Sequence, residues 1–213
     1  MPKSNHPQKE ITDYFRSNIF ESLAAYTGWK IIKSSESNGI VSQEMAERYI
    51  GIQKDYPNFF SLTEQAFLMQ FVMLSLHSFD SDTRSHSLYK VDEQKTRAFI
   101  QQNKKVLDML FDLRNKLFAH KDAISGTGGF TIPSINDMDQ FFKNLMLFYN
   151  ELTAVIDDSS TIFSNAEEVK HDMEYLFMNL YRGEHSRKFE DDTKWSWEKS
   201  NEKVSDVTSD ITK

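Results

Sequence analysis

The stretch "MDQFFKNLMLFYNELTAV", Met138 to Val155, repeats large apolar residues at intervals of three and four. This is the period of one face of an α-helix rather than the alternation of a strand. Ser134, at the head of "SIND", supplies an N-cap signal just upstream. The stretch therefore predicts a long amphipathic helix. Its expected core positions are Met138, Phe141, Phe142, Leu145, Phe148, Leu152 and Val155.

The distribution of glycine and proline extends this pattern to the rest of the chain. Neither residue occurs between Pro57 and Gly126, nor between Pro133 and Gly183, so two long tracts lack a strong helix breaker. Besides the helix after Ser134, we expect two shorter helices over 11–26 and 42–52. A third begins at the capping box "SLTE" (Ser61) and runs toward Phe79, and a fourth runs from about Asp92 to His120. The last begins at "SNAE" (Ser164) and continues through Val169, Tyr175, Leu176 and Leu180. No segment alternates convincingly as a strand, since "GFTIP" (129–133) is short enough to be a loop. The expected fold is all-α, a bundle of about six helices.

Composition places this bundle in one ordinary globular domain. The chain has 213 residues, of which 39% are hydrophobic and 27% charged. We expect a helical domain over 1–182 and a polar tail over 183–213, either mobile or docked through Trp195 and Trp197. The absence of cysteine excludes disulfides, thiolate metal sites and a cysteine nucleophile.

Charge and hydropathy narrow the classes of function. The net charge of −7 disfavours a protein that coats nucleic acid by electrostatics alone, although it leaves room for a local basic site. No signal peptide is evident, and the apolar run Phe67–Leu76 is too short to span a bilayer. We therefore expect a soluble, cytoplasmic protein with no membrane partner.

The stretch "RNKLFAHKD", Arg114 to Asp122, places polar residues on apolar stripes of its helix. His120 continues the stripe of Val106, Leu110, Leu113 and Leu117, and Arg114 fills the gap in the stripe of Leu107, Phe111 and Phe118. Two interpretations stay open. In the first, Arg114 pairs with a carboxylate such as Asp108 or Asp112, and His120 caps the helix. In the second, the stripe packs against a symmetry mate, and two Arg–His pairs line one shared cleft.

Such a cleft would have usable chemistry. A histidine with an ordinary pKa of about 6.5 can move a proton at neutral pH, and a planar guanidinium can hold a phosphate. Lys116 and Lys121 flank the pair as candidate RNA-phosphate contacts. Residues 104–122 carry five positive and three negative side chains, so this segment is +2 while the remainder of the chain is −9. The local charge favours an anionic ligand.

At these residues the chain resembles a known family. "RNKLFAH" resembles the Arg-x(4–6)-His motif of HEPN domains, near the end of a long helix. The preceding "FLMQFVMLSLHSFDSDTRSHSLYKV" and the following "AHKD" resemble the abortive-infection (AbiU-like) subgroup. The resemblance covers roughly residues 61–122 well and the flanking helices in general character.

The resemblance implies a helical homodimer with a composite, metal-independent endoribonuclease site. Arg114 would stabilise the charge of the transition state, His120 would transfer protons, and Asn115 would bind substrate or orient the pair. Cleavage would leave a 2′,3′-cyclic phosphate, and the biological role would be that of an antiviral or toxin effector. An antitoxin or a nucleotidyltransferase would fit as a partner. A catalytically inactive scaffold that binds a partner protein or a nucleotide is the alternative, and a purely structural dimer is a third reading.

The expected site needs no cofactor and no metal. Glu168 and His171 have the Glu-x-x-His spacing of carboxylate di-metal bundles, but no second copy of that motif occurs. A solvated helix face explains them better.

Overall fold

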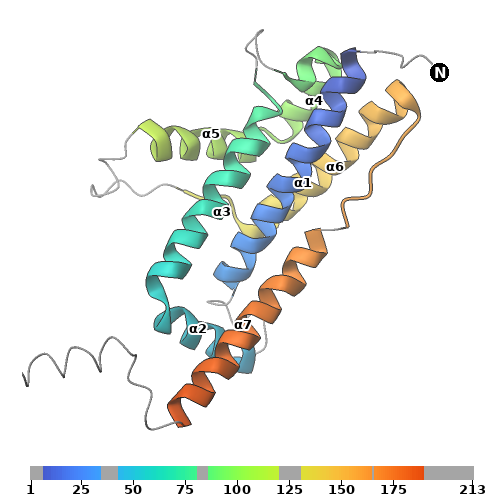
Figure 1. Ribbon diagram of the computed structural model, residues 1–213. Helices are drawn as coiled ribbons and strands as arrows, with labels where there is room; N and C mark the ends of the chain where they lie inside the picture. The colour runs from blue at the N-terminus through green and yellow to red at the C-terminus, as the bar shows by residue number, and fades with distance from the viewer. Residues whose placement is uncertain (1–6, 35–42, 81–85, 120–130, 165, 190–213) are drawn as a thin grey trace, which may run out of the picture. The chain divides into compact units, whose positions relative to one another are not determined.

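The computed structural model describes the chain except residues 1–6, 35–42, 81–85, 120–130, 165 and 190–213 (Figure 1). The described residues form seven α-helices and one short 3₁₀ helix and contain no strand, which confirms the expected all-α fold. The elements are α1 (Pro7–Ser34), α2 (Gln43–Asp55), α3 (Pro57–His77), η1 (Leu88–Lys90), α4 (Glu93–Gln102), α5 (Lys104–Ala119), α6 (Ile135–Asp157) and α7 (Ala166–Phe189). Contacts divide the chain into two units, Met1–Glu174 and Tyr175–Lys213.

Helix α6 begins and packs largely as its sequence predicts. The Ser134 hydroxyl accepts a hydrogen bond from the backbone N–H of Asp137 at 3.1 Å, which satisfies a donor in the first turn. The helix ends at Asp158, which adopts the left-handed conformation with φ 55°. All the expected core positions are buried except Val155, which is 76% exposed. The apolar period therefore continues one turn beyond the surface that covers it.

Helix α3 starts four residues before the predicted capping box. Pro57 occupies the first turn, where its fixed φ and missing N–H suit a helix start, and the N-cap residue, Tyr56, caps the helix through no side-chain hydrogen bond. Ser61 therefore lies inside the helix, and the prediction that it opens α3 is wrong.

The predicted single helix from Asp92 to about His120 is also wrong, because it is broken at Asn103. Asp92 does cap the first part, with its carboxylate accepting from the Lys95 N–H at 2.9 Å. Asn103 leaves the helical conformation (φ −105°, ψ 18°), and its side-chain amide donates to the Phe99 carbonyl at 2.9 Å. A side chain that bonds its own backbone in this way competes with helix continuation. The result is two helices, α4 and α5.

The core of the first unit lies between α1, α3, α5 and α6. Figure 1 shows α3 running beside α1 and α1 beside α6, and these pairs are in contact. Helices α1 and α3 approach closely at Gly28, where an added Cβ would lie only 2.7 Å from the Phe67 ring. Near this approach Ser22 and Ser75 join their hydroxyls at 2.7 Å. Small residues therefore let these two helices pack tightly.

Helix α3 has an apolar inner face and an uncharged exposed face. Its inner face buries Phe71, Val72 and Leu76, yet no residue on its exposed face carries a charge. The exposed residues are Pro57, Asn58, Phe59, Ser61, Leu62, Gln65, Ala66, Met69, Gln70 and Met73. The expectation that this segment is too short for a bilayer rested on ten residues, whereas α3 has 21 and meets the length and composition of a membrane span. One such helix is weak evidence, because core helices of soluble proteins pass the same test.

Helix α7 continues beyond the point where the sequence predicts a tail. It passes through Gly183 and ends at Phe189, and residues 190–213, including Trp195 and Trp197, lie outside the described residues. Met173 and Phe177 are its buried apolar residues, whereas Tyr175 is 69% exposed. Within the second unit, buried Glu184 accepts hydrogen bonds from the Arg187 guanidinium at 2.7 and 3.0 Å.

Candidate functional site

Helix α5 carries the motif, and its apolar stripe faces the core of its own unit. Val106 is 8% exposed, and Leu110 and Leu113 are fully buried. The hypothesis that this stripe packs against a symmetry mate is therefore corrected for Val106, Leu110 and Leu113, which the chain itself covers. The heptad-like spacing identifies an apolar face but carries no information on what covers it.

Arg114 lies beside this stripe, on the adjacent stripe of Leu107 and Phe111, and is only half-buried. Its guanidinium carbon lies 5.1 Å from the centre of the Phe111 ring, a cation–π contact. Its Nε and Nη2 donate to the Asn115 side-chain oxygen at 3.4 and 3.2 Å. These contacts place Arg114 and Asn115 together, with the guanidinium open to solvent on one side.

Among the described residues, Arg114 is the α5 cation without a carboxylate within ion-pair distance. Lys104 pairs with Asp108 at 2.5 Å, Lys116 pairs with Asp112 at 2.7 Å, and Lys105 pairs with Asp137 on α6 at 3.1 Å. The two aspartates considered as partners of Arg114 are thus bound by lysines. In this part of the chain the guanidinium charge is left available to an external anion.

The lysine pairs also shape the local electrostatics. The hydrogen bond from Lys105, reinforced by one from Ser134, holds the pKa of Asp137 below its ordinary value. Lys116, which the sequence suggests as a phosphate contact, is compensated by Asp112 on the same helix face.

The remaining predicted site residues, His120 and Lys121, lie outside the described residues. The backbone of α5 ends at Ala119, so His120 directly follows the last described turn.

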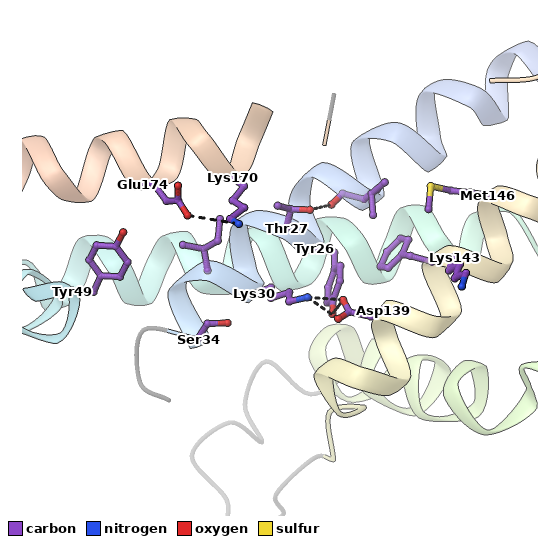
Figure 2. Close-up of a pocket in the computed structure, with 13 residues that line it drawn as sticks. Tyr26, Thr27, Lys30, Ser34, Tyr49, Asp139, Lys143, Met146, Lys170 and Glu174 are labelled. Atoms are coloured by element: carbon purple, nitrogen blue, oxygen red, sulfur yellow. Dashed lines mark hydrogen bonds and ion pairs between the residues drawn. The ribbon is translucent and has the colours of Figure 1, made fainter. Parts of the chain in front are cut away.

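A cavity lies away from this motif. It has a volume of about 490 Å³ and is lined by residues of α1, α2, α6 and the first part of α7 (Figure 2). Tyr26, buried at its floor, places its hydroxyl 2.8 Å from the Asp139 carboxylate, and Lys30 donates to both oxygens of that carboxylate at 2.8 and 2.7 Å. Burial, and then the hydrogen bond to Asp139, raises the pKa of Tyr26 well above its ordinary value.

Sequence reasoning did not find this cavity. Tyr26 and Asp139 stand 113 residues apart and belong to no recognisable motif. Their helices were expected, but the pairing of one face with another depends on the tertiary fold, which periodicity does not encode. The sequence offered no signal that would have joined these two residues.

The metal candidates gain no third ligand in the described part of the chain. His171 lies 3.8 Å from Glu174, and no group of three or more His, Asp or Glu side chains there is arranged to hold an ion.

Comparison with known proteins gives one finding. A family model described as AbiU2, of the HEPN type, matches residues 9–176. This range contains the Arg–His motif, the whole of α3 and all the residues that line the cavity. No curated protein and no solved structure matches the chain.

Proposed function

We propose, because the chain belongs to the AbiU2 family of HEPN-domain abortive-infection proteins, that it is a metal-independent endoribonuclease that cuts RNA during abortive infection. The observation that carries the proposal is the state of Arg114. It is a half-buried arginine on the motif helix that no described carboxylate neutralises, and it stands directly before Asn115 and six residues before His120. Such a residue is suited to bind a phosphate.

In the proposed reaction the RNA supplies its own nucleophile. His120 removes the proton from a ribose 2′-hydroxyl, and the 2′-oxygen forms a bond to the adjacent phosphorus. The bond between phosphorus and the 5′-oxygen then breaks, and that oxygen receives a proton from an imidazolium. Arg114 stabilises the negative charge on the phosphate oxygens, with Asn115 holding the guanidinium. The products are a 2′,3′-cyclic phosphate and a 5′-hydroxyl, and no metal takes part.

Two histidines, one as base and one as acid, would come from two copies of the chain. We therefore propose a homodimer with a composite site. Because the α5 stripe is buried within its own unit, the interface must lie elsewhere, and the exposed face of α3 fits it. Helix α3 contacts α5 directly, so a two-fold axis along α3 would bring both motif helices into one region.

The exposed face of α3 has the spacing and the chemistry of a helix–helix contact. Phe59, Leu62, Met69 and Met73 are 51, 67, 38 and 41% exposed and, with Ala66, follow a 3-4-3-4 spacing, which we call the α3 stripe. At roughly 200 Å² for a full large apolar side chain, these residues leave about 350–400 Å² of apolar surface per copy. Stable dimers need about 800 Å² per partner, so surfaces beside the α3 stripe would have to supply the remainder.

The lack of charge on the exposed face of α3 favours contact with a second copy of the chain over contact with a membrane. In a two-fold contact the same patch of the two copies meets, and an uncharged stripe avoids the like-charge repulsion that a stripe of one charge would meet. A helix that lies on a membrane generally carries lysine or arginine on its polar face, and α3 exposes neither.

The remaining features of the proposal follow from its chemistry. The site of action is the cytoplasm, where the RNA substrate is found, and the outcome is arrest of translation. The RNA-cleaving activity of such a toxin must be inhibited until it is required. The proposed partner is therefore a neutralising antitoxin or a nucleotidyltransferase that modifies the chain. Lys121 and Lys116 are proposed contacts to flanking phosphates, with Lys116 exchanging Asp112 for RNA.

The decisive experiment incubates the purified protein with total RNA in EDTA and analyses the fragment termini. His120→Ala should lower cleavage about 100-fold or more, on the scale of proton-transfer catalysis. Arg114→Lys should also impair cleavage, since it keeps the charge but loses the planar fork. Lys95→Gln, on α4, is the matched control and should cut like the wild type. Intact RNA after incubation with a correctly folded wild-type dimer would contradict the proposal and favour an inactive HEPN scaffold.

A further inference from the structure

We propose that the cavity between α1, α6 and the first part of α7 binds a small amphipathic organic anion, an apolar or aromatic body that carries a single negative group. The cavity measures about 490 Å³, which is within the range of small-molecule sites, and all its lining residues belong to the first unit (Figure 2). It contains no residue of the HEPN motif, so this site is separate from the proposed nuclease site.

The walls of the cavity are suited to an apolar body. Leu23, Ile31, Phe142 and Met146 line it, and the buried Phe142 ring stacks on Tyr26 with centroids 4.9 Å apart. Thr27 adds no free donor, because its hydroxyl bonds the Leu23 carbonyl at 2.8 Å. An apolar ligand surface would therefore meet carbon atoms along most of the cavity.

The charges of the lining leave room for one anion. Three lysines face two carboxylates there, so the lining as a whole is +1. Lys30 is held by both oxygens of Asp139, and Lys170 lies 3.9 Å from Glu174. Lys143 has no carboxylate within ion-pair distance among the described residues and is exposed at the rim. A single uncompensated lysine matches one carboxylate or sulfonate better than a polyphosphate.

A buried polar atom offers a second contact. Ser34 is only 4% exposed, lines the cavity, and its hydroxyl has no hydrogen-bond partner among the described residues. Buried hydroxyls are normally satisfied, and a bound ligand with an oxygen or nitrogen atom would satisfy this one. Apolar walls, one free cation and one orphaned hydroxyl together define the class of ligand.

The test uses a matched pair of fluorescent probes, the aromatic monoanion 8-anilinonaphthalene-1-sulfonate and the neutral N-phenyl-1-naphthylamine, titrated into the full chain. We expect one site per chain for each probe. Met146→Trp should fill the cavity and weaken both probes at least tenfold. Lys143→Gln should weaken only the anionic probe, about threefold to tenfold. Circular dichroism should show that each variant keeps the helical content of the wild type.

Two control variants assign the signal to the cavity. Lys95→Gln removes a lysine from a smaller hollow between α4 and α6, and Met69→Glu disrupts the apolar α3 stripe. Both should leave the binding of both probes unchanged. Undiminished binding to Met146→Trp, loss of binding in Met69→Glu, or a Lys143→Gln effect that is absent or equal for the two probes would overturn the proposal.

Discussion

Asn103 occupies the junction of α4 and α5 with both ends of its side-chain amide in use. The amide nitrogen donates to the Phe99 carbonyl, and the oxygen accepts from the Asn144 side chain at 2.9 Å, which ties the junction to α6. The residue is 7% exposed, so these bonds are made out of water. A buried amide with satisfied partners fixes a local geometry that an apolar side chain would not.

Asn103→Ala should therefore destabilise the protein by about 1–3 kcal/mol, because the Asn144 amide loses its partner. The measurement is urea unfolding followed by circular dichroism. Asn144→Ala and the double variant complete a cycle, which should show a coupling between the two side chains. Equal stability of Asn103→Ala and the wild type would contradict the role of the pair.

At this scale the sequence foretold which residue types matter but not how each one is satisfied. Arg114 was expected to interrupt an apolar stripe, and it lies on that stripe but is only half-buried. The sequence did not show that Arg114 would lack a carboxylate partner. Lys104 and Lys116 take Asp108 and Asp112 instead, through ordinary i,i+4 spacing. The sequence did not predict the helix break at Asn103, because an asparagine inside a helical pattern is only a weak breaker.

Among the elements, α6 shows how local signals fix a helix. Its N-cap, its apolar period and its left-handed end all agree, which explains why its start was predicted correctly. The length of α1 was underestimated, because Gly28 and the polar residues around it interrupt the apolar periodicity over its last turns. In the structure Gly28 is needed for the close approach to Phe67.

Ser134→Ala should remove the cap of α6 and cost about 1 kcal/mol of unfolding free energy. Ser134→Asp should restore most of that stability, because its carboxylate can accept the same hydrogen bond and favours the helix N-terminus. Thermal and urea unfolding of the three proteins gives the comparison. A restored Asp variant is the sign that capping, and not packing, causes the loss.

The start of α1 is joined to the end of α6 by an ion pair between Lys9 and Asp157. The hydrogen bond from Lys9, followed by one from Ser159, lowers the pKa of Asp157. A carboxyl whose folded pKa is depressed adds stability above its unfolded value of about 3.9, and that stability is lost as the pH falls through the folded pKa. Asp157→Asn should thus be less stable than the wild type at pH 7.

The same comparison at acid pH provides the control. The difference in unfolding free energy between Asp157→Asn and the wild type should shrink as the pH falls from about 5 to below the folded pKa of Asp157. Urea unfolding at a series of pH values measures it. A difference that stays constant over this range would show that the contact acts by packing rather than by charge.

For the whole molecule, the all-α class and the AbiU2 family followed from the sequence, whereas the surfaces did not. An apolar helix with no charge over most of its length is typical of a protein core, and only the structure reveals that one face of α3 has no cover within the described chain. The cavity beside Tyr26 belongs to the same class of feature, because it is formed by residues from four helices.

Leu62→Glu should convert the proposed dimer into a monomer, because two like charges would face each other across the α3 stripe. Sedimentation or light scattering measures the mass, and circular dichroism checks the fold. Val155→Glu is the matched control, since Val155 is 76% exposed on α6, outside the stripe. A wild-type monomer would reject the interface and leave the nuclease assay as a separate question.

If the uncharged α3 stripe forms the dimer interface, the activity depends steeply on the concentration of the protein. If the proposed site is complete only in a pair, then well below the dissociation constant a tenfold rise in the chain would raise the number of paired molecules roughly a hundredfold, by mass action. RNA cutting would then depend on the square of the amount of protein. A cell could keep a low level of the chain harmlessly, and a burst of synthesis, or release from a partner, would cross a sharp threshold.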